Sequence, residues 1–408
     1  MTAPEPTSDL TPTGNRPLRV CYFGAYRAGY ARNRLMIEGL RRNGVEVIEC
    51  HERLWHGVED RVQAVESSWK SPSFWRRVLG TYARLIRKYY AMRPDYDVMV
   101  VGYPGQFDVF LARLLSWQRR RPLAWDILMS IYLVAVERRL DRKSPGVVFA
   151  LHLLERAGLQ LPDVLVMDTE QYAAWFGRVC GVPRHRFQFV PIGADTDGFL
   201  PEESDGAHSQ DAAGSERVFR VLYYGTFIEN HGVATIMEAA RLLRSHGDVE
   251  FELIGDGPER AMAEAMIREH ELANVHMVGW LNQAGLRTHI ASANLCLGVF
   301  GATTQSMITV HNKIKECMAM GKPVLTGTSP AVRDAFEHGK HLYLCGRADP
   351  LALAAAIVEL QQRPRLREEM AQAGRELVRS EYTVECNGER FKSILVDVAT
   401  RMSQEHLC

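Results

Sequence analysis

The segment KIKECMAMGKPVLTG, residues 313–327, combines a lysine, a glutamate and the predicted start of a helix. Lys313 and Glu316 are one helical turn apart, so a helix places both side chains on one face. The amides at a helix N-terminus attract phosphate, and a carboxylate can accept hydrogen bonds from two neighbouring hydroxyls. The segment therefore predicts a site that holds a sugar hydroxyl and a phosphate together, with ordinary helix packing as the alternative.

Two series of apolar segments, alternating with helix-length stretches, must position this site. Gly321 supplies the left-handed residue that ends the helix, and a strand opens at Pro323. Strands that are apolar throughout and alternate with helices are typical of a parallel sheet covered on both faces. The other predicted strands span 19–26, 45–50, 96–102, 121–128, 163–168, 187–195, 220–225, 249–255, 275–280, 294–300 and 341–345. Both halves are thus predicted to be doubly wound α/β domains.

A polar stretch divides the two series. PEESDGAHSQDAAGSE, residues 201–216, is acidic and lacks periodicity, as is typical of a linker. We therefore predict Rossmann-like domains over 17–198 and 218–385, joined by a linker over 199–217. Residues 1–16 are predicted to be a disordered leader and 386–408 a C-terminal helix. In such a pair of domains, ligands are expected at the carboxyl ends of the strands, in a central cleft.

Composition excludes several classes of function. The chain has 408 residues and a formal net charge of zero, so its global charge does not favour nucleic acid or another polyanion as a partner. No run approaches the roughly 20 apolar residues that span a bilayer. The eight cysteines lie far apart without a C-x-x-C motif, as in a reducing cytosol, and no metal site is predicted. We expect a cytoplasmic protein, with the inner membrane surface as an alternative location.

Several motifs of the second half resemble those of family 4 glycosyltransferases, which have the GT-B fold. They are YYGTFIENHG (223–232), LIGDGP (253–258), VHMVGW (275–280), NKIKECMAMGKPVLTG (312–327) and DPLALAAAIVELQQRPRLREEMAQAGRELV (349–378). The first half matches more loosely, through FGAYRAGYARNRL (23–35) and VPIGADTDGF (190–199). The resemblance implies retaining transfer of a hexose-type sugar from a nucleotide diphosphate sugar, with a UDP-sugar expected, to a hydroxyl acceptor. It also implies a role in glycan or glycosylated natural-product biosynthesis.

The resemblance places the donor mainly in the second half, where this sequence departs from the family. Thr226 and His231 stand where relatives carry an arginine and a lysine for the diphosphate. Ile308 stands where the first of two paired glutamates is expected. Glu316 matches the second glutamate, which holds the ribose, and Lys313 is the predicted substitute cation. The residues predicted to bind the donor are Gly24, Gly225, Thr226, His231, Gly279, Trp280, Thr304, Gln305, Asn312, Lys313 and Glu316.

The first half supplies candidate acceptor-side residues. Arg27, Arg32 and Arg34 follow Gly24 in a polar stretch, where they face the acceptor or are simply solvated. Asp126 occupies roughly the place where relatives hold a histidine or aspartate near the reacting sugar. The predicted catalytic residues are Asp126, Lys313 and Glu316, with Asp168 and Glu170 as a rival carboxylate pair.

The resemblance also implies the mechanism. Relatives retain configuration, need no metal or cofactor beyond the donor, and use a donor phosphate oxygen to help deprotonate the acceptor. Such a reaction depends on positioning and on stabilising the leaving diphosphate. The alternatives are a nucleotide-sugar epimerase on the same fold and a degenerate, non-catalytic nucleotide-sugar-binding protein.

One segment bears on the acceptor. SFWRRVLGTYARLIRKYYAMR, residues 73–93, interleaves basic and aromatic residues, as in a helix lying on an anionic membrane surface. A helix on the membrane surface would suit a protein whose acceptor is a lipid-linked glycan. The alternative is a crossover helix packed on the sheet, which leaves a small-molecule acceptor open. As in GT-B proteins, we expect residues 386–408 to cross back to the first domain and act as a hinge.

Overall fold

The computed structural model describes residues 16–54, 72–195, 198–199 and 218–405. Apart from residues 16 and 199, the predicted leader and linker lie outside the described residues. The chain divides into two compact units. The first comprises Met1–Met167, Phe176–Val190 and Asn387–Cys408, and the second comprises Asp168–Trp175 and Pro191–Cys386.

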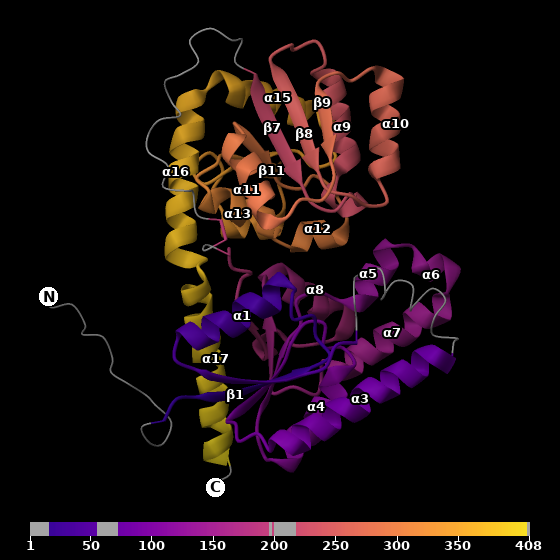
Figure 1. Cartoon of the computed structure of the whole chain (residues 1–408), viewed down its shortest axis with the longest axis vertical. Coiled ribbons are helices and arrows are strands. Elements are labelled where there is room, and N and C mark those ends of the chain that lie inside the picture. Colours follow the sequence, from indigo (N-terminus) through magenta and orange to yellow (C-terminus); the bar gives the residue numbers. More distant parts are fainter. Residues whose placement is uncertain (1–15, 55–71, 196–197, 200–217, 406–408) are drawn as a thin grey trace, which may run out of the picture. The chain divides into compact units, whose positions relative to one another are not determined.

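The first unit is built on a parallel six-stranded sheet in the order β2-β1-β3-β4-β5-β6 (Figure 1). Its strands are β1 (Arg19–Gly24), β2 (Glu46–His51), β3 (Val98–Val101), β4 (Leu123–Asp126), β5 (Val164–Met167) and β6 (Phe187–Phe189). The central strands are buried throughout, which explains their continuous apolar sequences.

Helices cover both faces of this sheet. The helices of the first unit, including two that continue into the second, are α1 (Ala31–Arg42), α3 (Pro72–Met92), α4 (Asp108–Gln118), α5 (Ile131–Glu137), α6 (Leu140–Lys143), α7 (Pro145–Gly158), α8 (Glu170–Cys180), η2 (Arg184–Arg186) and α17 (Val384–Glu405). On one face, Leu40 of α1 and Phe391 of α17 join a buried cluster with Val98. On the other, Phe23 meets Tyr89 of α3, with ring centroids 6.1 Å apart.

The second unit repeats this plan with the strand order β12-β11-β10-β7-β8-β9, again all parallel. Its strands are β7 (Phe219–Tyr224), β8 (Val249–Ile254), β9 (Val275–Val278), β10 (Leu295–Leu297), β11 (Val324–Gly327) and β12 (Tyr343–Cys345). Its remaining elements are η3 (Glu229–His231), α9 (Val233–Leu242), α10 (Arg260–His270), α11 (Gln283–Ser292), α12 (Thr304–Ile308), α13 (Asn312–Ala319), α14 (Pro330–Ala335), α15 (Pro350–Gln362) and α16 (Pro364–Glu381).

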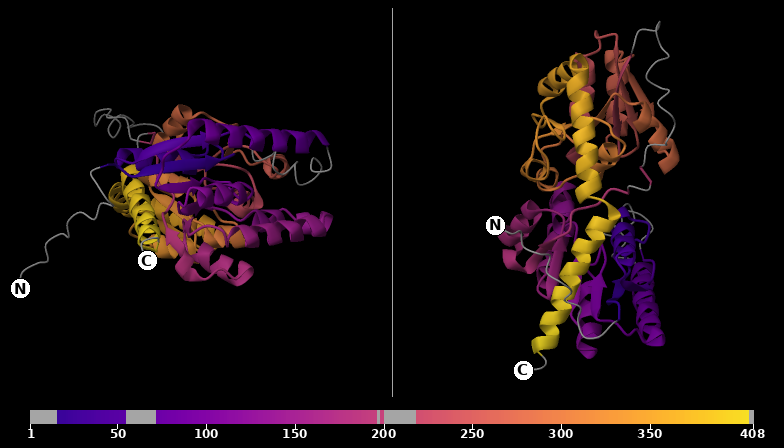
Figure 2. Two further views of the ribbon diagram at one scale, coloured as in Figure 1. Left: turned by 90° about the horizontal axis from the view of Figure 1, so that it is seen from below. Right: turned by 90° about the vertical axis from the view of Figure 1, so that its left-hand side faces the viewer.

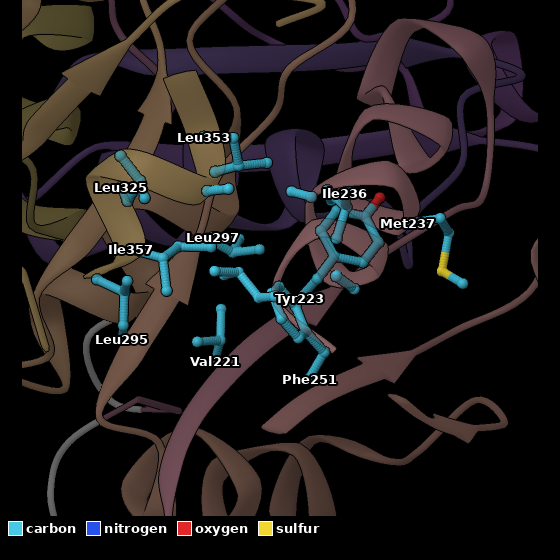
Figure 3. Packing of buried hydrophobic residues seen from close by; sticks show 14 of the residues in the cluster. Val221, Tyr223, Ile236, Met237, Phe251, Leu295, Leu297, Leu325, Leu353 and Ile357 are labelled. Carbon is cyan, nitrogen blue, oxygen red and sulfur yellow. The ribbon is translucent and has the colours of Figure 1, made fainter. Parts of the chain in front are cut away.

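Two hydrophobic clusters hold the second unit together, one on each face of its sheet. The first packs α9 and α15 against alternate strand residues, and Figure 3 shows Tyr223, Ile236 and Leu353 within it. The second packs α13 and α16 against the opposite face, with Ile314 and Met318 buried. Both units are therefore doubly wound α/β, as the sequence predicts.

Every predicted strand is present, and the helix predicted over 73–93 is α3. Residues 168–175 and 191–198 group with the second unit rather than with the first. Contacts within that unit explain the difference, since Thr169 donates to the Ile308 carbonyl (2.6 Å) and Lys315 donates to the Ile192 carbonyl (2.5 Å). At the other end of the chain, residues 387–408 group with the first unit through α17.

Candidate functional site

The candidate site lies where the strand order of the second sheet reverses. β7 has β8 on one side and β10 on the other, so chain connections diverge between β7 and β10. Ligands of doubly wound sheets bind at this switch point, beyond the carboxyl ends of the strands. Gly225 follows β7, and α13 begins close by, because the side chain of its second residue, Lys313, lies against Gly225.

Lys313 is the central cation of this site. A Cβ added to Gly225, which has φ +140°, would lie 2.8 Å from the Lys313 ammonium. The ammonium lies 4.2 Å from the centroid of the Tyr223 ring, and within the described chain it has no hydrogen-bond partner. Lys313 is 6% exposed, and burial lowers its pKa to about 7. A buried cation without a partner among the described residues, at the switch point of a doubly wound sheet, is typical of a site that binds an anion.

Two histidines border Lys313. His231 and His311 have ring centroids 5.1 Å apart, in an edge-to-face arrangement. His231 Nδ1 lies 2.7 Å from the Thr226 carbonyl, which can only accept, so Nδ1 carries the proton. Burial and the charge of Lys313 hold the pKa of His231 well below its usual value and lower that of His311 to about 3. Both imidazoles are therefore neutral near pH 7, so Lys313 is the side chain among these three that can carry positive charge.

Glu316 lies on the same helix, one turn after Lys313. Its Oε2 accepts a hydrogen bond from the Tyr224 hydroxyl at 2.8 Å. Burial raises the pKa of the carboxyl, while the Tyr224 hydrogen bond and Lys313 oppose that rise. The Tyr224 contact fixes Glu316 in place, and among the described residues its Oε1 accepts no hydrogen bond, so this oxygen can accept one from a ligand hydroxyl.

Arg347, which the sequence analysis did not identify, adds a second cation. Its guanidinium donates to the carbonyls of Gly301 and Thr328, each at 2.7 Å, while its remaining terminal nitrogen is buried without a partner in the described chain. Its charge contributes to the low pKa of His311, so the two side chains are close. Arg347 follows β12 without a motif around it, and no sequence signal pointed to it.

The other residues predicted to bind the donor differ in burial and in position. Asn312 begins α13 beside Lys313, with a buried side-chain oxygen that has no partner among the described residues. Thr304 is exposed at the start of α12, whereas Gln305 is buried. Gly279 and Trp280 follow β9, the edge strand, and Trp280 is 60% exposed. Ile308 is buried, so the position of the first glutamate is part of the core.

The structure pairs Asp126 with Arg32 in the interior of the first unit. Both carboxylate oxygens of Asp126 accept from the Arg32 guanidinium, at distances of 2.8–3.1 Å, and the third nitrogen of Arg32 donates to the Val190 carbonyl. Asp126 is 0% and Arg32 1% exposed. A carboxylate held twice by a buried guanidinium is typical of a structural ion pair, which favours a role in stability over one in activating or binding an acceptor.

The loop after β1 already binds a carboxylate of its own unit. The Asp108 carboxylate accepts from the Ala25 amide (2.9 Å) and the Tyr82 hydroxyl (2.7 Å), and it lies directly against Gly24. The amide that would meet a phosphate beside Gly24 therefore already binds a carboxylate. Arg34 is exposed, and Arg27 lies over the Tyr30 ring. The rival pair falls in the second unit, with Asp168 buried and Glu170 exposed at the start of α8.

Two units of six parallel strands, each doubly wound, have the architecture of the GT-B class of protein. Within this class, residues 218–363 match the model of the family Glycosyl transferases group 1. This match covers the Lys313–Glu316 site, and it confirms the resemblance drawn from the sequence.

Known proteins support the same assignment. The chain is 25% identical over 185 residues to the amylovoran biosynthesis glycosyltransferase AmsK of Erwinia amylovora, and 27% identical over 247 residues to the alpha-D-kanosaminyltransferase of Streptomyces kanamyceticus. These alignments cover 45% and 60% of this chain, and 44% and 63% of the relatives, so the chain spans about half the length of the curated relatives it matches. The structure of HepE from Anabaena, in complex with UDP and glucose, has the same fold, with a TM-score of 0.66 and 16% identity over 94% of this chain and all of that one.

Proposed function

We propose that this protein transfers a sugar from a nucleotide diphosphate sugar to a hydroxyl acceptor in the biosynthesis of a glycan or a glycosylated natural product. The observation that carries the proposal is the unpartnered ammonium of Lys313 against Gly225, one helical turn from Glu316. The relatives reported above are named as glycosyltransferases, which favours this activity over an epimerase or a degenerate binding protein.

The diphosphate would lie between Gly225 and the start of α13. There the Lys313 ammonium and the free terminal nitrogen of Arg347 offer donors to phosphate oxygens, and the first amides of α13 add the positive end of its dipole. These groups replace the arginine and lysine that the family resemblance led us to expect at Thr226 and His231. Glu316, held in place by its hydrogen bond with Tyr224, would accept hydrogen bonds from the two ribose hydroxyls.

The same groups support transfer with retention and without a metal. The bond between the anomeric carbon and the diphosphate breaks as the acceptor oxygen bonds to that carbon on the same face. The acceptor proton passes to a leaving phosphate oxygen, and Lys313 and Arg347 stabilise the negative charge on the departing diphosphate. No side-chain base is assigned, because Asp126 is held by Arg32.

A UDP-sugar is the donor that we propose. HepE, which shares the fold, was solved with UDP. Because Ile308 replaces the first glutamate of the pair, the sugar hydroxyls would be held by the polar groups of α12 and its approach, including Thr304, and by backbone. This change alters which sugar is accepted rather than which nucleotide.

A nucleotide panel tests the proposal. Calorimetric titration with UDP, GDP, ADP and TDP, without added metal, should show that one of them, expected to be UDP, binds the wild type and binds Glu316→Ala at least about tenfold more weakly. NMR of the product formed from the matching α-linked donor should show an α-linkage. Failure of all four nucleotides to bind, or formation of a β-linked product, would overturn the donor or the stereochemical part respectively.

A further inference from the structure

An unusual share of the exposed apolar surface lies on three helices of the first unit. Twelve large apolar side chains of the described residues are exposed, and eight of them belong to α3, α4 and α7. The eight are Trp75, Leu79, Tyr90, Met92, Leu114, Trp117, Phe149 and Leu153. Leu79, Leu114 and Phe149 are 67%, 62% and 62% exposed, so these side chains project into solvent.

The three helices form one layer, with α4 in the middle (Figure 2). Tyr82 and Tyr90 of α3 donate to Asp108 and Gln118 at the two ends of α4, each at 2.7 Å. Gly158 of α7 lies against Val109 on the other side of α4. The eight exposed apolar side chains therefore lie on three neighbouring helices, whose outer surface we call the α3–α4–α7 face.

The outward direction of these side chains follows from helical periodicity. In α4, the residues turned toward the sheet are buried, among them Val109, Ala112 and Leu115. Leu114 and Trp117 lie on the opposite side of the helix. In a soluble helix that side is normally polar, so an apolar outer side needs another explanation.

The part of the chain that contains these three helices is rich in positive charge. From residue 72 to residue 158 the sequence contains fifteen Lys and Arg against seven Asp and Glu, although the whole chain is neutral. Three of those seven acids, Asp108, Asp126 and Glu155, are buried at 2% exposure or less. α3 carries five basic residues and no acidic one, and Arg76 and Arg87 on it are exposed.

We infer that the α3–α4–α7 face docks on an anionic membrane surface. Trp and Tyr side chains favour the boundary between headgroups and acyl chains, leucines and phenylalanines enter it, and arginines attract anionic headgroups. This combination of exposed apolar groups with an excess of positive charge fits a lipid surface rather than a second copy of the same face, since two such faces would repel each other. The consequence that the sugar acceptor is lipid-linked rests on the proposed function, whereas the docking itself does not.

Vesicle co-sedimentation of the full chain tests the inference. The vesicles consist of phosphatidylcholine alone or of phosphatidylcholine and phosphatidylglycerol in equal parts. Wild type should sediment with the anionic vesicles and not with the neutral ones, and added salt should release it. Replacing Arg76 and Arg87 by glutamine should weaken binding about fivefold per arginine, and the triple variant Leu79→Gln, Leu114→Gln, Phe149→Gln at least about tenfold.

Matched controls lie in the second unit. Leu351→Gln, at a position 69% exposed, and Arg365→Gln, whose side chain is 91% exposed, should leave vesicle binding unchanged. A wild type that stays in solution, or that binds as tightly after both sets of changes on the α3–α4–α7 face, would overturn the inference. A concentration-dependent dimer that the triple variant dissociates would also overturn it, in favour of a second copy. Nucleotide binding by the same variants is measured separately, so a failure here leaves the proposed function standing.

Discussion

The ammonium of Lys313 lies 4.2 Å from the centroid of the Tyr223 ring and against Gly225, without a hydrogen-bond partner among the described residues. Burying a cation in this way costs stability, and proteins accept such a cost mainly at sites that bind something. We therefore expect the buried charge of Lys313 to destabilise the folded protein and to favour an anionic ligand.

This cost predicts opposite effects of Lys313→Met on stability and binding. The pKa of Lys313 is 10.5 in the unfolded chain and about 7 in the folded protein, so the folded protein loses this proton at a lower pH. Between these values the unfolded state binds more protons, so folding stability rises with pH, and below them the buried charge is a penalty. The variant should gain about 1–3 kcal/mol in free energy of unfolding at pH 7, measured by denaturant titration.

Lys315→Met provides the contrast. Lys315 is equally buried, but it donates to the Ile192 carbonyl at 2.5 Å and lies over the Tyr382 ring. Its removal leaves a buried carbonyl unpaired and should cost about 1–3 kcal/mol. If both lysine variants shift the free energy of unfolding in the same direction, the claim that Lys313 destabilises the fold because it lacks a partner is wrong.

Nucleotide diphosphate binding should depend on pH through Lys313. Burial lowers its pKa to about 7, and a bound diphosphate would raise that pKa. Binding therefore takes up a proton above pH 7, and affinity should fall by up to about tenfold per pH unit from pH 7 toward pH 9, while staying flat from pH 6 to 7. His231 and His311 are neutral in this range because their pKa values are lowered.

Calorimetry in buffers of different ionisation enthalpy checks this directly. The titrations should report net proton uptake on binding that grows between pH 7 and 8.5, and the uptake should vanish in Lys313→Met. Proton release, or uptake that persists in the variant, would assign the pH dependence to another group.

Gly225→Ala should damage the same site through the backbone. Gly225 has a φ angle of +140°, which residues other than glycine rarely adopt. The methyl group of an alanine there would lie 2.8 Å from the Lys313 ammonium. The strain should cost about 1–3 kcal/mol and displace Lys313, so that nucleotide binding weakens as well. Gly247→Ala is the matched control, since an added Cβ there contacts nothing within 4 Å. Equal behaviour of the two variants would contradict the close approach at Gly225.

Asp126→Ala should act on stability rather than on the chemical step. The change leaves the Arg32 guanidinium buried without its carboxylate, at an expected cost of about 3–5 kcal/mol. Thermal unfolding of the variant measures the cost, and donor turnover measured well below its melting temperature separates it from catalysis. A variant that melts like the wild type but has lost turnover would restore Asp126 to the active site.

The C-terminal helix should stabilise the first unit. Phe391 and Leu395 of α17 are fully buried in its core cluster. Phe391→Ala should cost about 3–5 kcal/mol, whereas exposed Ser393→Ala should have little effect. Deletion of residues 386–408 removes the whole contact and should lower the melting temperature further, and a truncated protein with unchanged melting would contradict this role of α17.

The sequence predicts the fold well because each strand of these sheets is an apolar run bounded by glycine, proline or polar residues, which is a local signal. That Lys313 and Glu316 lie on one face of α13 was also predictable from a local signal, their spacing of one helical turn. The partners that decide the site are remote in the chain: Asp126 meets Arg32 across 94 residues, and Arg347 reaches Gly301 across 46. No periodicity reports such pairs, so the pairing of Asp126 with Arg32 and the place of Arg347 could not be predicted.

The most direct test of the account is calorimetric titration of UDP, without added metal, into the wild type and Lys313→Met. The account predicts that the wild type binds UDP and that the variant, although more stable, binds it about 10- to 100-fold more weakly. If the variant binds UDP as tightly as the wild type, Lys313 is not the diphosphate cation and the donor site must be placed elsewhere.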